Sequence, residues 1–265
     1  MTGAESGGPA EPESEAESEA DALARLYDLD LAEDVGDDIG LYLALAGRTG
    51  GPILELAAGT GRIVRPLAAA GYEVTALDLD PAMLARLGRP SPRITPVIAD
   101  LTTWRPPRPV YRLAILGLNA LFLMAERHLQ RAAIESLAAA LAPGGVAVVD
   151  IWLPDATDLA RYDQRLLLDY IRTDPASGRT VTKTVAALHD AATATVLLTS
   201  IYDEGRPGAP TSRWIRRDLL RLVGAAELAD LARAAGLEVE SLAGDYGLEP
   251  LGPGDERAIL VAHRP

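Results

Sequence analysis

Residues 53–80, ILELAAGTGRIVRPLAAAGYEVTALDLD, constrain the fold of this chain more than any other stretch. A short apolar run over 52–56 predicts a buried strand, and the AAGTG turn at 57–61 leads into a helix with one apolar face. A second strand over 73–77 then ends on Asp78. Such a βαβ unit holds a nucleoside, because small turn residues let the backbone approach the ligand while the acid accepts hydrogen bonds from ribose hydroxyls.

The turn sequence separates the nucleoside classes. A pyrophosphate-binding turn reads G-x-G-x-x-G, and here no glycine follows Gly61 at the third place. A P-loop needs G-K-[ST], and Arg62 follows Gly61 instead. A NAD-dependent oxidoreductase therefore remains only as an alternative reading, with the missing glycine as the feature that argues against it.

The motif Glu55-Leu-Ala57-Ala58-Gly59-Thr-Gly61 resembles motif I of class I S-adenosylmethionine (SAM) dependent methyltransferases, E-x-G-x-G-x-G, with Ala57 at the place of the first glycine. The run DLDPAML from Asp78 to Leu84 resembles the D-x-S-P-x-M-L motif of that family. This resemblance implies a Rossmann-like α/β fold with a seven-stranded, mostly parallel sheet whose last strand is antiparallel. It implies SAM as cofactor, with a cofactor site formed by Tyr27, Glu55, Ala57, Gly59, Gly61, Arg62, Asp78, Leu79, Met83, Asp100, Leu101, Leu118 and Asn119.

Strands and helices alternate through the rest of the first half of the chain. Strands are predicted over 94–99, 111–117 and 146–152, with helices over 82–87 and 125–141. Strands joined through helices favour a parallel sheet with right-handed crossovers, and ligands then bind beyond the carboxyl ends of the strands.

The amino-acid composition changes between residues 165 and 223. Threonine, valine, isoleucine and tyrosine dominate there, and turns separate the segments 166–173, 180–188, 195–202 and 212–223. These segments predict an inserted antiparallel β cap, which in the resembled family covers the substrate pocket and in some members forms a dimer surface. Helix 225–235 and strands 236–243 and 256–263 then complete the predicted sheet.

These patterns predict three parts. Residues 1–20 form an acidic, disordered tail, because they hold glycine, proline, serine, alanine and six glutamates but little to bury. Residues 21–160 and 224–265 form the SAM-binding domain with an N-terminal helical lid, and 161–223 form the cap for substrate binding or dimerisation.

The composition limits the kinds of partner that the chain can bind. The net charge of −13 lacks the basic footprint of a nucleic-acid binder, so a DNA or RNA methyltransferase is disfavoured. No apolar run reaches the roughly 18 residues that span a bilayer, and the N-terminus is no signal or transit peptide, so a cytoplasmic protein is expected. Without cysteine, thiolate metal sites and disulfides are excluded. An oxygen-ligand metal site from Asn119, Asp150 and Asp155 is disfavoured too, since the acid that such sites carry after the fourth strand is missing.

Candidate catalytic groups are few. N-methylating relatives carry a histidine four residues after the asparagine position, where this chain has Leu123. We predict Asn119, Asp245 and Tyr246 as catalytic candidates, the last two because they follow the predicted strand 236–243. His128 in a helix, His189 in a hairpin turn and His263 on an edge-like strand are interpreted as structural. Predicted substrate contacts are Tyr42, Phe122, Leu123, Trp152, Tyr202 and Trp214.

The resulting hypothesis is a SAM-dependent methyltransferase for a small molecule, most similar to amino-sugar and amino-acid N-methyltransferases of bacterial specialised metabolism, and a homodimer through the cap. An O- or C-methyltransferase on the same scaffold and a non-catalytic SAM-binding regulatory protein remain alternatives. Methyl transfer from a sulfonium depends largely on alignment and exclusion of water, and a general base is needed where the nucleophile must lose a proton.

Overall fold

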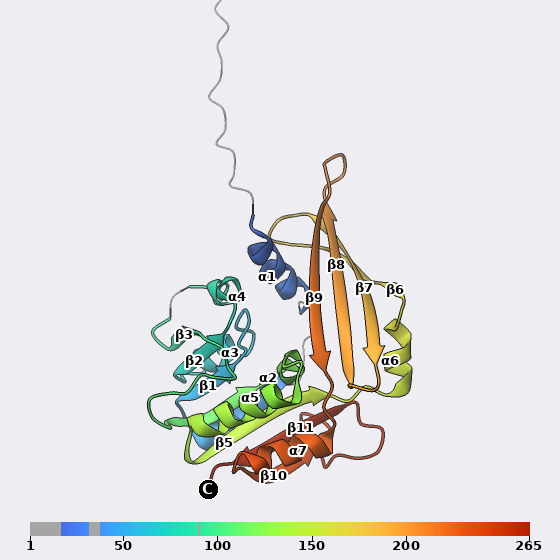
Figure 1. Cartoon of the computed structure of the whole chain (residues 1–265). Helices are drawn as coiled ribbons and strands as arrows, with labels where there is room; N and C mark the ends of the chain where they lie inside the picture. The colour runs from blue at the N-terminus through green and yellow to red at the C-terminus, as the bar shows by residue number, and fades with distance from the viewer. Residues whose placement is uncertain (1–16, 32–37, 90) are drawn as a thin grey trace, which may run out of the picture.

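The computed structural model describes residues 17–31, 38–89 and 91–265, which form two sheets with helices around them (Figure 1). The larger sheet has seven strands and the smaller sheet, which we call the cap sheet, has four. In Figure 1 the cap sheet stands beside helix α1 (Glu19–Asp30), above the larger sheet.

The larger sheet has the strand order β10-β11-β5-β4-β1-β2-β3. Its strands are β1 (Ile53–Leu56), β2 (Val74–Asp78), β3 (Ile94–Ile98), β4 (Tyr111–Leu116), β5 (Leu141–Trp152), β10 (Glu238–Ala243) and β11 (Arg257–His263). β1, β2, β3, β4 and β5 pair in parallel, whereas β11 pairs antiparallel with both β5 and β10. The predicted fold class, with an antiparallel last strand and an inserted antiparallel cap, is confirmed.

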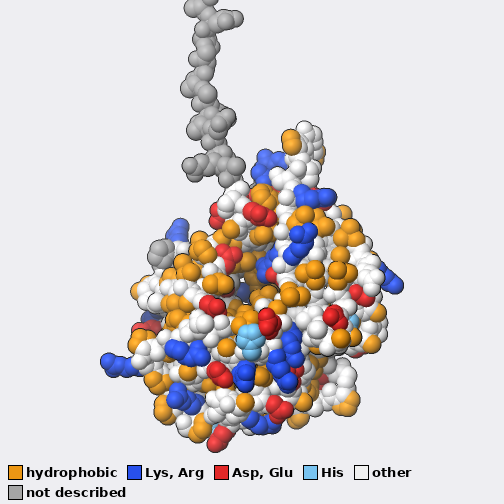
Figure 2. Space-filling model, in the orientation of Figure 1, with side chains coloured by type: hydrophobic (Ala, Val, Ile, Leu, Met, Phe, Trp, Pro, Cys, Tyr) orange, Lys and Arg blue, Asp and Glu red, His pale blue; other side chains and the backbone are white. Residues whose placement is uncertain are grey.

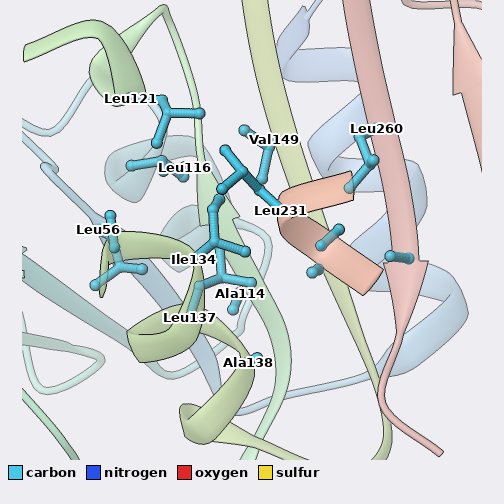
Figure 3. Close-up of a cluster of buried hydrophobic side chains, with 14 of the residues drawn as sticks. Leu56, Ala114, Leu116, Leu121, Ile134, Leu137, Ala138, Val149, Leu231 and Leu260 are labelled. Carbon is cyan, nitrogen blue, oxygen red and sulfur yellow. The ribbon is translucent and has the colours of Figure 1, made fainter. Parts of the chain in front are cut away.

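Helices cover both faces of this sheet. They are α2 (Asp38–Thr49), α3 (Val64–Ala69), α4 (Pro81–Ala85), α5 (Arg127–Ala140) and α7 (Ala225–Ala234). Alternate strand residues point to opposite faces, so Leu54 and Leu56 pack with α5 and α7, while Ile53 packs with α2 and α3. Figure 3 shows the first of these layers, where Leu116 and Val149 of the sheet face Ile134 of α5 and Leu231 of α7.

The cap sheet has the order β6-β7-β8-β9, and all its pairs are antiparallel. Its strands are β6 (Leu166–Thr173), β7 (Thr180–Asp190), β8 (Thr195–Gly205) and β9 (Ser212–Arg221), and α6 (Ala156–Tyr162) leads into it from β5. Helix α1 packs on this sheet through Leu26 and Leu29, which meet Val181 and Tyr202. The lid helix therefore makes its own apolar cluster with the cap.

The structure corrects some predicted boundaries. Helix α1 begins at Glu19, inside the segment 1–20 predicted as a tail, because the Ser18 hydroxyl caps it by accepting from the Asp21 N–H. The rest of that tail, 1–16, lies outside the described residues. The prediction that His189 lies in a turn is wrong, because β7 continues to Asp190, paired with β8. Among residues 17–31, 38–89 and 91–265, no helix is long and apolar enough to cross a membrane.

Candidate functional site

A pocket of about 930 Å³ lies where the parallel strands end, between the sheet, α1 and the cap. Figure 2 shows the molecule hollowed there, with hydrophobic side chains around the opening. The size lies within the usual range for small-molecule sites. Its sheet side follows β1, β2, β4 and β5 and includes Glu55, Ala57, Gly59, Thr60, Arg62, Asp78, Met83, Leu118, Asn119, Phe122, Leu123 and Trp152. Its other side comes from α1, α6 and the cap.

The glycine turn after β1 needs residues with a left-handed backbone. Ala57, Gly59 and Gly61 have φ of 55°, 54° and 86°. A Cβ at Gly61 would lie 2.3 Å from Leu87 Cδ2, so only glycine fits there without a shift of that leucine. Ala57 adopts an angle that is unfavourable for a residue with a side chain, which explains why the family motif has glycine at this place.

Asp78 holds this turn in position. Its Oδ2 accepts the Gly59 N–H at 2.7 Å, and its Oδ1 accepts the Asp80 N–H at 2.9 Å. Each carboxylate oxygen still has a free lone pair, so Asp78 can accept further hydrogen bonds from a ligand. The carboxylate thus connects the turn after β1 with the end of β2.

Two buried polar atoms in the pocket wall lack a hydrogen-bond partner among the described residues. They are Glu55 Oε2 and Thr60 Oγ1, in side chains that are 4% and 1% exposed. A buried polar atom without a partner costs about 1–3 kcal/mol, so such atoms in a pocket indicate a polar ligand. Burial raises the pKa of Glu55 well above its ordinary value, against the opposing charge of Arg62. These groups without partners fit a polar ligand such as SAM.

Arg62 also lies in this wall. It pairs with the buried Asp38 at the start of α2, with Nη1 3.1 Å from Oδ1. This ion pair joins α2 to the turn and fixes the guanidinium at the pocket. Its predicted role in the cofactor site stays a prediction.

The segment after β4 supplies the centre of the pocket wall. Leu118 and Asn119 both have left-handed backbones, with φ of 51° and 63°. The Asn119 side-chain oxygen accepts the backbone N–H of Trp152, and the backbone N–H of Asn119 donates to the Asp150 carbonyl oxygen at 3.1 Å. Asn119 therefore ties the end of β4 to the end of β5 before the short 3-10 helix η1 (Ala120–Leu123).

Tyr27 brings α1 to the glycine turn. The position of a Cβ at Gly59 would be 3.5 Å from its ring, and the guanidinium carbon of Arg216 lies 5.9 Å from the ring centre. Burial raises the pKa of Tyr27, so its hydroxyl remains a donor at neutral pH. Tyr27 thus links helix α1 and the cap to the glycine turn on the sheet side of the pocket.

Several predicted site residues lie outside the pocket walls. Tyr202 and Trp214 face the same side of the cap as the pocket, but α1 covers them. Tyr202 donates to Asp30 at 2.8 Å, and Trp214 packs against the cluster that contains Leu26 and Leu29. Tyr42 is fully buried in the core. These side chains stabilise the lid and the core, and we do not include them in the site.

The predicted catalytic pair after β10 is also outside the pocket walls. Tyr246 donates to the buried Asp150 at 3.0 Å, and burial together with the Asp150 charge raises its pKa. Asp245 is exposed and accepts the Glu249 N–H at 3.1 Å, which is turn chemistry. Neither side chain reaches the pocket, because β10 lies at the edge of the sheet, beyond β11.

Three residues predicted for the cofactor site, Asp100, Leu101 and Leu79, do not line the pocket either. Asp100 is exposed, and its Oδ1 accepts the N–H and hydroxyl of Thr102. Leu101 is in the core, and Leu79 is 67% exposed. The walls contain residues that follow β1, β2, β4 and β5 but none that follow β3.

The sequence analysis missed the residues on the other side of the pocket, the side of α6 and the cap, which we call the acceptor side. It is formed by inward-facing residues of β7, β8 and β9 and by one face of α6: Ala187, His189, Val196, Leu198, Arg216, Asp218, Leu220, Asp158, Leu159 and Tyr162. The signal that could have found the strand residues is alternation: His189 shares a face with Val185 and Ala187, and Arg216 with Asp218. The other two histidines lie outside the pocket: His128 is next to Glu126, and His263 is next to Glu238.

His189 is held beside α6. Its backbone N–H donates to Oδ1 of Asp163, the residue directly after α6, at 2.9 Å. Asp163 also forms an isolated β-bridge with Ala187. His189 is half-buried in the pocket wall, and no hydrogen bond to its imidazole is made by the described residues. The ring nitrogens are therefore available to a bound acceptor. In the described part of the chain, no cluster of three or more histidines and acids could hold a metal ion.

Comparison with known proteins identifies the domain. Residues 53–145 match the family model of a methyltransferase domain. No curated protein matches the chain. The structure is similar to that of the CcbJ methyltransferase from Streptomyces caelestis, with 24% identity, a TM-score of 0.74 and coverage of 93% of this chain and 97% of that one.

Two further structures are similar. The sugar N-methyltransferase KedS8 from Streptoalloteichus sp. ATCC 53650 shares 21% identity, with 99% of each chain covered and a TM-score of 0.73. SAM-bound CalS10, an amino pentose methyltransferase from Micromonospora echinaspora, shares 24% identity, with 89% of this chain and 91% of that one covered and a TM-score of 0.65. Residues 53–145 therefore form a methyltransferase domain, and the fold of the chain is that of the SAM-dependent enzymes.

Proposed function

We propose that this chain transfers a methyl group from SAM to the nitrogen of a small-molecule amine in bacterial specialised metabolism. The observation that carries the choice of nitrogen is His189, an available imidazole in the wall opposite the glycine turn. An amine is largely protonated at neutral pH, so it must lose a proton before it can act as a nucleophile. The N-methyltransferases with similar structures support the same acceptor class.

The sheet side of the pocket, which we call the cofactor side, has groups that suit SAM. Asp78 accepts hydrogen bonds from the ribose hydroxyls, while Glu55 and Thr60 supply polar atoms without a partner that the ligand would satisfy. Met83, in the wall after β2, offers an apolar surface for the adenine ring. SAM, when bound, supplies a methyl group activated by its sulfonium.

The residues of the acceptor side align the second substrate and remove its proton. His189 accepts the proton of the ammonium, which frees the nitrogen lone pair. The nitrogen then forms a bond to the methyl carbon as the carbon–sulfur bond breaks, giving a methylated ammonium and S-adenosylhomocysteine, and His189 releases its proton to water. Tyr27 and α1 exclude water from the site, which favours an aligned displacement.

The test is turnover by the full chain with methyl-labelled SAM and a panel of amino sugars and amino-acid amines. We expect S-adenosylhomocysteine and a product whose nuclear magnetic resonance spectrum shows an N-methyl group. Methyl groups on oxygen or carbon would favour the O- or C-methyltransferase alternative. SAM binding without turnover of any panel member would favour a regulatory protein, and NAD binding without SAM binding would overturn the proposal.

We further propose a homodimer through the outer face of the cap sheet. On β6 this face exposes Leu166, Leu168 and Ile171 by 62%, 59% and 62%, and Leu188 and Leu219 continue it on β7 and β9. Exposed apolar surface of this extent is typical of a contact surface. Light scattering should give a dimer for the native chain and a monomer for Leu168→Lys; a monomeric native chain would contradict the proposal.

The remaining predictions on surroundings also belong to the proposal. A small-molecule acceptor suits an enclosed pocket, the acidic chain does not favour nucleic acid, and a cytoplasmic location would give access to SAM. Fractionation of producing cells checks the location.

A further inference from the structure

The acceptor side of the pocket carries excess negative charge. Its charged side chains are Glu19 on α1, Asp158 on α6, and Arg216 and Asp218 on β9. Arg216 Nε donates to Asp218 Oδ2 at 2.8 Å, so these two charges offset each other. Glu19 and Asp158 are then left without a cation in this wall.

The described residues of the pocket wall include just one other cation, Arg62, and it belongs to the cofactor side, paired with Asp38. The single lysine of the chain, Lys183, pairs with Asp30 and Asp169 at 3.0 and 3.2 Å, away from the pocket wall. Phosphate recognition in proteins depends on arginine, lysine or open helix N-termini. Helix α6 offers no open N-terminus, because its own Asp155 caps it.

The rest of this wall is apolar. It is formed by leucine, valine and aromatic side chains from α1, α6, η1 and the cap: Leu23, Phe122, Leu123, Leu159, Tyr162, Val196, Leu198, Leu220 and Leu222. Such a wall buries a hydrophobic body and would leave a phosphate without partners.

Asp158 and His189 lie on adjacent elements. The residue after α6, Asp163, bridges to Ala187 on β7 and accepts the His189 N–H. Asp158 itself is half-buried, and its Oδ2 accepts the Asp155 N–H at 3.0 Å, which leaves its other lone pairs for a ligand. Asp158 and the proposed base thus line the same pocket from two elements that contact each other.

We infer that the acceptor is an amphipathic amine that enters as an ammonium ion with an apolar body and carries no phosphate. This inference rests on the proposed N-methylation and sharpens it, because it excludes nucleotide-linked amino sugars and selects free amines or amine-bearing glycosides. Asp158 and Glu19 are the residues that select the positive charge.

The experiment compares three matched probes: phenethylamine, phenethyl alcohol and phenethyl phosphate. Each is titrated by calorimetry into the full chain saturated with S-adenosylhomocysteine. We expect the amine to bind roughly tenfold more tightly than the alcohol, since an ammonium near unpaired carboxylates gains about that much, and the phosphate to bind most weakly. Equal binding of amine and alcohol, absence of amine binding, or tightest binding of the phosphate would each overturn the inference.

Variants locate the effect. Asp158→Asn and Glu19→Gln should each weaken amine binding about three- to tenfold and leave alcohol binding unchanged. Asn at 158 can still accept the Asp155 N–H, so α6 keeps its cap. The matched control is Asp230→Asn on the exposed face of α7, which removes the same charge away from this pocket and should change neither affinity. An equal loss in the control would show a long-range charge effect and contradict the assignment.

The outcome is separable from the proposed function. Saturation with S-adenosylhomocysteine is measured first, so a failure of the cofactor site appears before any probe is added. N-methylation of a phosphate-bearing acceptor would overturn this inference and leave the proposed N-methyltransferase intact. O-methylation alone would overturn the proposed function.

Discussion

The two sides of the pocket are built in different ways. The cofactor side centres on one continuous stretch, in which Asp78 closes a turn only 19 residues earlier through the Gly59 N–H, and the segments after β4 and β5 complete it. The acceptor side comes from three cap strands together with α6 and α1, and neighbours such as His189 and Val196 meet through cross-strand pairing. The first side is therefore specified locally and suits one constant ligand, whereas the second can change by substitution on one face of a sheet.

Helix α1 joins the two sides and gives the largest predicted effect. Arg25 donates to Asp174 at 2.9 Å and to Glu204 at 3.0 Å, and both acids are buried. Arg25→Met should lower the free energy of unfolding by about 3–5 kcal/mol, because it leaves the buried Asp174 without its cation and Glu204 with Arg179 alone. Chemical denaturation measures this loss, and Arg48→Met, at an exposed ion pair with Glu240, is the control with a change below about 1 kcal/mol. A loss as small as that of the control would show that α1 is not anchored by this network.

His189→Gln tests the acceptor side. The turnover number should fall about 100-fold or more, the usual contribution of a general base, while affinity for S-adenosylhomocysteine stays unchanged. Steady-state kinetics and calorimetry measure the two quantities. His128→Gln, on the exposed N-terminal end of α5, is the matched control and should keep full activity. A fall of less than threefold for His189→Gln would remove its assigned role.

Asp78→Asn tests the cofactor side. It should weaken binding of S-adenosylhomocysteine by about 1.5–3 kcal/mol, because charge-assisted hydrogen bonds to the ribose are lost. Calorimetry checks this, with Asp245→Asn in the exposed turn as the control. Unchanged affinity would refute the ribose role, and loss of amine probe binding in the same variant would show that the two sides are not independent.

Acid should weaken the anchor of α1. Burial opposes ionisation of Asp174, but hydrogen bonds from Ser177 and the Ala176 N–H, with the charge of Arg25, hold its pKa below the ordinary value. A depressed native pKa stabilises the fold above the unfolded pKa of about 4, and this stability is lost as the pH falls through the native pKa. Denaturation at pH 3 and pH 6 should show a smaller pH effect in Arg25→Met. An identical pH effect in both proteins would contradict the coupling.

The smallest predicted effect concerns the departure from the family motif. Ala57→Gly should stabilise the fold by roughly 0.5–1 kcal/mol, because glycine adopts the observed left-handed backbone without strain, partly offset by its freedom in the unfolded chain. Thermal unfolding measures it, and Ala142→Gly on the extended strand β5 is the control that should not stabilise. Destabilisation by Ala57→Gly would mean that the Ala57 methyl contributes packing in the pocket wall.

Sequence reasoning predicted the fold well and the site unevenly. Periodicity and the two motifs predict the glycine turn at Gly59 and Gly61 and the end of β2 at Asp78, because these features depend on local backbone geometry. Tyr202 and Trp214 were predicted as substrate contacts because they belong to the cap expected over the substrate pocket, but α1 covers them through Leu26 and its neighbours. Asp245 and Tyr246 were predicted from strand order along the chain, and their strand lies at the edge of the sheet, away from the pocket.

The sequence by itself determined the βαβ unit of residues 53–80, the order of strands and helices, and the existence of the cap, because each follows from short-range hydrophobic periods and turn residues. Only the tertiary structure decided what the cap contributes to the pocket. The side chains of β7, β8 and β9 face the site in alternation, so their selection depends on where β7 ends and how the strands pair. Because β7 reaches Asp190, His189 lies in the wall of the pocket beside α6, and long-range packing brings it there.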